Sequence, residues 1–257
     1  MSLQSEFTTI ARDDGRAALA TVVASEGTPE VGAKILLRAD ETTDGTLGDP
    51  ALDTVALEAA DELLWAERSE LRELDGGVSL FVDVTAPAPR VIILGAVDYT
   101  AALCTLARSA GWRPYVCDPR TAFATQERFP DAEEVIAEWP DVAFEKIGID
   151  RATYIAVLTH DPKLDDAALT VALRSDAAYI GAMGSRRAQE RRRERLVEHG
   201  ITDEDLARLA APIGLDLGAT SPEETALSIM AEIVAVRNGH DGGRLGAVKG
   251  RIHGGDG

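Results

Sequence analysis

The stretch Val91–Arg120, VIILGAVDYTAALCTLARSAGWRPYVCDPR, decides the fold of this chain. Its first four residues are apolar and end at Gly95, which predicts a strand buried on both faces of a parallel sheet. Apolar residues at helical spacing follow over 101–110, and a second strand is expected over Arg113–Cys117, with Asp118 after it. The order strand, tight turn, helix, strand and acid is typical of the first half of a dinucleotide-binding unit.

The phosphate-binding fingerprint of such a unit is incomplete here. The glycines of a GxGxxG motif would fall on Gly95, Val97 and Thr100, so only the first is present. Val97 places a branched side chain where the backbone should approach a pyrophosphate, and Asp98 places a negative charge at the helix start. Asp118 follows at roughly the 20-residue distance of an acid that binds a ribose hydroxyl. A Rossmann-like fold is therefore predicted, and ordinary NAD(P) binding is the disfavoured alternative.

Length and composition exclude several classes of protein. A chain of 257 residues can form one or two domains with a sizeable core. No apolar run is long enough to span a membrane, and the first residues lack the features of a signal peptide. Cys104 and Cys117 are the only cysteines, which argues against a disulfide scaffold and favours a cytoplasmic protein.

The charge balance is strongly acidic. The formal net charge is −18, and only four of the basic residues are lysines. Because 45% of the residues are hydrophobic and show clear periodicity, the chain is not an acidic disordered segment. The interpretation that we favour is a halophilic protein, whose carboxylates stay hydrated in high salt while their repulsion is screened. Nucleic acid is not an expected partner, because its binding needs a basic surface.

The chain divides into two expected domains. Strands are predicted over 16–25, 32–38 and 78–84, with a polar turn at 40–45 and a helix after Pro50, which together make a small α+β domain over 1–86. The stiff segment Ala86–Pro89 marks the boundary. The fold class is therefore α/β, with the Rossmann-like parallel-sheet domain over 87–240, and the glycine-rich residues 241–257 are expected to form a flexible tail.

The second domain continues with alternating strands and helices. The expected elements are strands over 151–159 and 178–182, and helices over 166–173, from Ser185 to His199, over 202–209, and from Ser221 to Asn238. The helix after Ser185 carries alternating arginines and glutamates, which we expect to pair at i,i+3 as on a solvated helix. Most of this run is accordingly interpreted as structural.

Four segments would meet at the carboxyl edge of the predicted sheet, where ligands bind in such folds: Gly95, Asp118, His160-Asp161 and Gly181–Ser185. His160 could transfer a proton or bind an anion, or else cap the following turn, and the residues favour neither reading.

A helix start at Gly184-Ser185 exposes backbone N–H groups, and the neighbouring Arg186 favours an anion site over a simple N-cap. The loop Gly214–Gly218 could close over a ligand, although a simple connection is favoured.

Several motifs together resemble the XdhC/CoxI family over most of the chain. They are Asp118-Pro-Arg120, the segments Leu158–Asp165 and Tyr179–Arg186, the segment Pro212–Glu224, and Ala20–Val23 with Gly27 and Gly32-Ala33. The resemblance implies an N-terminal XdhC/CoxI domain before a Rossmann-like domain. It also implies a maturation factor that binds molybdenum cofactor (molybdopterin), an anion with a phosphate, and delivers it to a molybdenum hydroxylase such as xanthine dehydrogenase.

Two departures from the family pattern concern cysteine. The family usually carries a glycine-cysteine turn where this chain has Gly45–Asp53, and a second one where only Gly76-Gly77 remains. A role for those cysteines therefore cannot be transferred to this chain.

The sequence predicts no catalytic and no metal-binding residue. The candidate cofactor-binding residues are Gly95, Asp118, Arg120, His160, Asp161, Gly181, Gly184, Ser185, Arg186, Gly214, Asp216 and Gly218. The alternatives to a cofactor-delivery protein are an NAD(P)-dependent oxidoreductase, with Asp118 on the ribose and His160 as acid–base, and a degenerate scaffold without ligand binding. Whether the chain forms a homodimer stays open.

Overall fold

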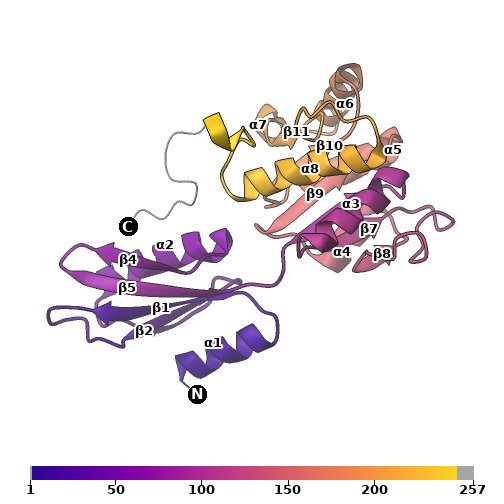
Figure 1. Ribbon diagram of the computed structural model, residues 1–257. Coiled ribbons are helices and arrows are strands. Elements are labelled where there is room, and N and C mark those ends of the chain that lie inside the picture. Colours follow the sequence, from indigo (N-terminus) through magenta and orange to yellow (C-terminus); the bar gives the residue numbers. More distant parts are fainter. Residues whose placement is uncertain (1, 248–257) are drawn as a thin grey trace. The chain divides into compact units, whose positions relative to one another are not determined.

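The computed structural model describes residues 2–247 (Figure 1). The chain divides into two compact units, Met1–Pro87 and Ala88–Gly257. Within the described residues, no helix is both long and apolar enough to cross a membrane. The predicted flexible tail falls largely outside the described residues, and its described part includes the 3-10 helix η1 (Leu245–Ala247).

The first unit is a five-stranded antiparallel sheet with order β3-β2-β1-β5-β4. Its elements are α1 (Leu3–Arg12), β1 (Ala17–Ala24), β2 (Lys34–Arg38), β3 (Thr43–Thr46), α2 (Pro50–Ala66), β4 (Glu70–Leu74) and β5 (Val78–Thr85).

Helix α2 covers one face of this sheet because its apolar side lies against alternating strand residues such as Ala20, Leu80 and Val82. Phe7 of α1 packs with Leu19 and Leu36 in a second apolar cluster.

The second unit is a six-stranded sheet in which all the paired strands are parallel. Its elements are β6 (Arg90–Leu94), α3 (Asp98–Ser109), β7 (Arg113–Cys117), β8 (Glu134–Ile136), α4 (Pro140–Ile147), β9 (Thr153–Val157), α5 (Pro162–Leu173), β10 (Tyr179–Ala182), α6 (Arg186–Glu198), α7 (Asp203–Ala207), β11 (Leu209–Ala210) and α8 (Pro222–Arg237).

The strand order, β11-β10-β9-β6-β7-β8, is that of a doubly wound Rossmann sheet. The order reverses between β6 and β9, so the crevice in which such folds bind ligands lies between the ends of these two strands. The predicted α/β fold class, a Rossmann-like parallel sheet after a small α+β domain, is confirmed.

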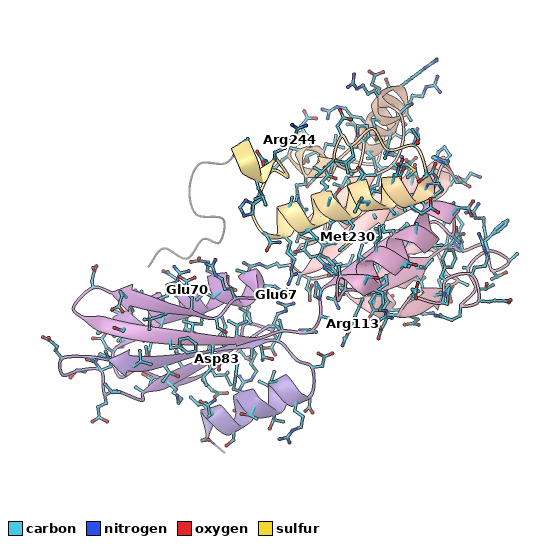
Figure 2. The ribbon with its side chains drawn as sticks, viewed as in Figure 1. Glu67, Glu70, Asp83, Arg113, Met230 and Arg244 are labelled. Carbon is cyan, nitrogen blue, oxygen red and sulfur yellow. The ribbon has the colours of Figure 1, made fainter. Side chains whose placement is uncertain are left out.

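Helices cover both faces of this sheet. On one face, α3 and α8 pack on the residues of the central strands that point toward that face. Met230 of α8 belongs to this apolar cluster (Figure 2). On the other face, α4, α5, α6 and α7 pack on the alternate residues, which include Ile155, Val157 and Ile180. Burial of both faces explains why the central strands read as continuous apolar runs in the sequence.

The structure also contains elements that the sequence did not predict. They are α1, β3, β4, β8, α4 and β11, and of these the strands have at most five residues. Helix α5 begins at Pro162, not at Asp166, because Asp161 accepts a hydrogen bond from the Lys163 backbone and caps it. The predicted polar turn at 40–45 is in part strand β3, which pairs with β2.

Candidate functional site

The turn after β6 lies directly against the end of β9, at the reversal point of the sheet. Gly95 has φ +110°, and a Cβ built there would lie 3.0 Å from the Thr159 backbone nitrogen. Glycine is therefore required at this position by both backbone conformation and space. The close approach fixes the turn against β9.

The backbone donors of this turn are already satisfied inside the protein. The Ala96 N–H donates to Asp118 Oδ2 at 2.8 Å, and the Val97 N–H donates to the Gly95 carbonyl at 3.1 Å. In a dinucleotide-binding turn such donors approach the pyrophosphate. Their internal use disfavours that function here.

Asp118, the acid that could have bound a ribose, is also engaged. The Arg120 guanidinium donates from Nε to Asp118 Oδ1 at 2.9 Å and from Nη2 to Oδ2 at 2.6 Å, and the Asp118 side chain is fully buried. Burial alone would raise the pKa of Asp118, but the hydrogen bonds from Arg120 and from the Ala96 and Arg120 backbone outweigh it and lower the pKa. By accepting hydrogen bonds from the Ala96 and Arg120 backbone, Asp118 therefore connects the turn after β6 to the turn after β7.

Asp161 and His160, which follow β9, have separate roles. Asp161 caps α5 and is close enough to Arg120 to raise the pKa of that guanidinium, after the larger effect of Asp118. His160 is exposed and does not provide the cap; it lines a cavity formed with β10 and α6. At the carboxyl edge, the segment after β9 therefore interacts with Arg120 in the turn after β7 and shares a cavity with the segment after β10.

This cavity has a volume of about 200 Å³ and carries an unusual concentration of positive charge. Its lining consists of His160, Pro162, Asp165, Met183, Gly184, Ala188, Arg191, Arg192 and Arg195. Three guanidinium groups and an imidazole thus surround one carboxylate, in a chain whose net charge is −18. We refer to these nine residues as the arginine cavity.

Two of its arginines are held by acids of α5. Arg192 Nη2 lies 2.6 Å from Asp165 Oδ2 and also donates to the Met183 carbonyl at 3.0 Å. Arg195 binds Asp166 through both Nε and Nη2, at 2.6 and 3.0 Å. The predicted i,i+3 pairing within α6 is wrong for Arg195, because α6 packs against α5 and the Arg195 guanidinium binds Asp166 there.

The Asp165–Arg192 pair contains two polar atoms without a partner. Asp165 Oδ1 and Arg192 Nε are buried and form no hydrogen bond in the part of the chain that the structure describes. Burial raises the pKa of Asp165, against the opposing effect of Arg192. Buried polar atoms normally have partners, so each exception requires an explanation.

Two of the predicted glycine sites are explained by packing. A Cβ at Gly181 would lie 2.5 Å from Ile213 side-chain atoms, and one at Gly214 would lie 2.5 Å from Ser228 Oγ. The Gly214 N–H donates to Glu232, which also accepts a hydrogen bond from the Tyr179 hydroxyl. These contacts fix the loop after β11 to α8.

The remaining predicted residues divide into two groups. Gly184 and His160 lie together in the arginine cavity, and Ser185 caps α6 through the Ala188 N–H. Ser185, Arg186, Gly214, Asp216 and Gly218 are not part of the lining of this cavity. The sequence therefore predicted the carboxyl edge of the sheet as the place of the site, but not four of the cavity residues: Asp165, Arg191, Arg192 and Arg195. The sequence feature that could have identified them is the set of six arginines in the α6 segment, although their pattern alone indicates a structural role.

Two larger cavities lack such a concentration of positive charge. One, of about 910 Å³, lies between α3, the loop at Arg128–Asp131 and the start of α8, and is mostly apolar. The other, of about 590 Å³ in the first unit, is lined by Asp49, Asp75 and Gly76 among others. It brings together the two segments in which the sequence departs from the cysteine pattern, a proximity that the sequence did not reveal.

Comparison with known proteins relates both units to one family. Residues 91–233 match the family described as the XdhC Rossmann domain, and residues 10–75 match the XdhC and CoxI family. Escherichia coli YqeB is 29% identical over 89% of this chain and 45% of its own length. A Bacillus subtilis protein named as a probable subunit of xanthine dehydrogenase is 29% identical, over 65% of this chain and 48% of its own length.

Two further similarities are informative. The molybdenum cofactor insertion chaperone PaoD of Escherichia coli is 27% identical over 59% of this chain and 41% of its own length. The chain thus spans about half the length of the curated relatives that it matches. A crystal structure described as a xanthine dehydrogenase from Bacillus halodurans has a TM-score of 0.54 at 20% identity, over 96% of this chain and 98% of that one, and shows the fold alone.

Proposed function

Because the chain belongs to the XdhC and CoxI family, we propose that it binds molybdenum cofactor and assists its maturation and insertion into a molybdenum hydroxylase. A client such as xanthine dehydrogenase is supported by the name of one relative, and insertion of the cofactor by the name of another. The cofactor is the cargo of this function. Its redox chemistry operates in the client enzyme.

The observation that carries the proposal is the arginine cavity at the carboxyl edge of the Rossmann sheet. Ligands of doubly wound folds bind at this edge, and the cofactor is an anion. In so acidic a chain, a cavity lined by three arginines provides a local attraction for such a ligand. Arg191, Arg195 and His160 contribute hydrogen-bond donors to its lining, and Gly184 borders it with φ +137°.

The structure disfavours the oxidoreductase alternative. A dinucleotide would need the donors at Ala96 and Val97 for its pyrophosphate and the Asp118 carboxylate for its ribose, and all of these groups are bound within the protein. The scaffold alternative predicts no ligand, so it is separated from the proposed function by a direct measurement of bound cofactor.

The test is the pterin content of the purified protein. Protein produced with a molybdenum hydroxylase in a molybdenum-replete host should release, after oxidation, a fluorescent pterin in near-stoichiometric amount. The control is the same protein from a host that cannot synthesise the pterin. Absence of pterin, together with absence of binding when the cofactor is added, would overturn the proposal. Activation of the client under those conditions would then favour a scaffold.

A further inference from the structure

We propose that the arginine cavity is a site for a tetrahedral oxyanion, bound by Arg191, Arg195 and His160. The oxyanion is either the terminal phosphate of an organic ligand or a free ion such as inorganic phosphate or molybdate. The cofactor's phosphate is named as one source because this inference rests on the proposed function. The oxyanion site itself follows from the positions of the charged groups on α5 and α6.

The distribution of charge is the first argument. The whole chain has 44 acidic and 26 basic residues, yet the lining of this cavity has three arginines and one acid. That acid, Asp165, is already bound to Arg192. Among residues 2–247, the Arg191 side chain has no hydrogen-bond or ion-pair partner, although its backbone belongs to helix α6. A positive charge left over in this setting attracts an anion.

The second argument is that the other two arginines are held in place. Arg195 uses Nε and Nη2 for Asp166, which fixes the plane of its guanidinium and leaves Nη1 for another acceptor. Arg192 is held by Asp165 and the Met183 carbonyl, so its charge stays within the cavity wall. An anion therefore meets donors whose orientation is largely fixed before binding.

The third argument is that the buried pair gives the cavity a rigid wall. The side chains of Asp165 and Arg192 are 5% and 4% exposed, and each retains one polar atom without a partner, Oδ1 and Nε. Both residues belong to the cavity lining. Because Oδ1 and Nε are themselves closed to solvent, they are not contact atoms for a bound ion, and the pair contributes to the cavity through its fixed position in the wall.

Size limits what can enter. Since a water molecule occupies about 30 Å³ of liquid, a cavity of about 200 Å³ holds a tetrahedral oxyanion with a few waters. The rest of a larger organic ligand would extend outside it. Gly184 borders the cavity with φ +137°, and a Cβ there would lie 3.3 Å from Gln189 Nε2 and 3.4 Å from the Ala188 Cβ, so both backbone conformation and space favour glycine at this wall.

The experiment is a calorimetric titration of the full chain with inorganic phosphate and with molybdate at constant ionic strength. Arg191→Ala should weaken binding at least tenfold. Arg186→Ala is the matched control, since it removes the same charge from the same helix outside the cavity, and should stay within about twofold of the wild type. Both positions are exposed, so their unfolding midpoints should match that of the wild type. Unchanged affinity in Arg191→Ala, or loss in Arg186→Ala alone, would overturn the proposal.

Pterin content of the same variants identifies the source of the oxyanion. Loss of both phosphate binding and pterin in Arg191→Ala supports the terminal phosphate of the cofactor. Loss of phosphate binding with pterin retained supports a free oxyanion. If the wild type binds phosphate at this site but never carries pterin, the site stands and the proposed function fails. If pterin is bound and no variant of the cavity changes either measurement, the proposed function stands and the site fails.

Discussion

Asp165 of α5 and Arg192 of α6 form an ion pair with an N–O distance of 2.6 Å, and both side chains are at least nine-tenths buried. The pair joins two helices that are neighbours on one face of the Rossmann sheet. A buried pair can be a poor source of net stability, but breaking it leaves one charge buried alone. This asymmetry gives the first prediction.

Asp165→Leu should lower the free energy of unfolding by about 3–5 kcal/mol, because Arg192 then remains buried without its partner. The double variant Asp165→Leu with Arg192→Met should recover at least half of that loss. Chemical denaturation of the single and double variants measures both values. A double variant that is less stable than Asp165→Leu alone would show that the pair is not the reason for the loss.

A second prediction concerns acid stability and Asp118. Its pKa is lowered from an ordinary value of 3.8, so the carboxylate contributes stability above that value and loses it as the pH falls through the folded pKa. Asp118→Asn should therefore be less stable at pH 7 and should show a flatter loss of stability below about pH 4. Asp98→Asn, at a carboxylate that is 89% exposed, is the control and should follow the wild type.

Nicotinamide dinucleotides should not bind. Titration with NADH and NADPH should give no saturable change in nucleotide fluorescence at micromolar concentrations, because Ala96, Val97 and Asp118 are bound internally. Saturable micromolar binding would contradict this reasoning and would restore the oxidoreductase alternative.

The two cysteines should be unreactive in the native protein. Burial raises the pKa of Cys104 to about 12 and that of Cys117 to about 12, so thiolate is scarce at pH 8. A chromogenic disulfide reagent should detect both thiols only after unfolding. Rapid modification of either thiol in the native state would show that the residue is accessible.

The protein should gain thermal stability in concentrated salt. A net charge of −18 produces self-repulsion that molar KCl screens, so the unfolding midpoint should rise with KCl concentration near neutral pH. The increase should diminish near pH 4, where many carboxylates are protonated. A midpoint that is independent of KCl at pH 7 would refute the halophilic interpretation.

Local patterns in the sequence predicted most of the second unit. The apolar run before Gly95 identifies a strand buried on both faces, because side chains on both sides of a parallel sheet must be apolar. The starts of the helices at Ser185, Thr202 and Ser221 were also predicted, and these three residues are the N-caps, since a helix start depends on residues within one helical turn. Short elements such as β8 were missed, because three residues carry too little periodicity to identify a strand.

The candidate site depended on contacts that no local pattern specifies. The sequence by itself determined a Rossmann-like sheet and the edge at which its loops meet. Only the tertiary structure decided that Arg192 and Arg195 pair with Asp165 and Asp166, while Arg191 remains available beside His160. The physical reason is that a charged side chain takes the partner that helix packing brings within reach. The packing of α6 against α5 sets that choice between residues 27 and 29 positions apart in the chain.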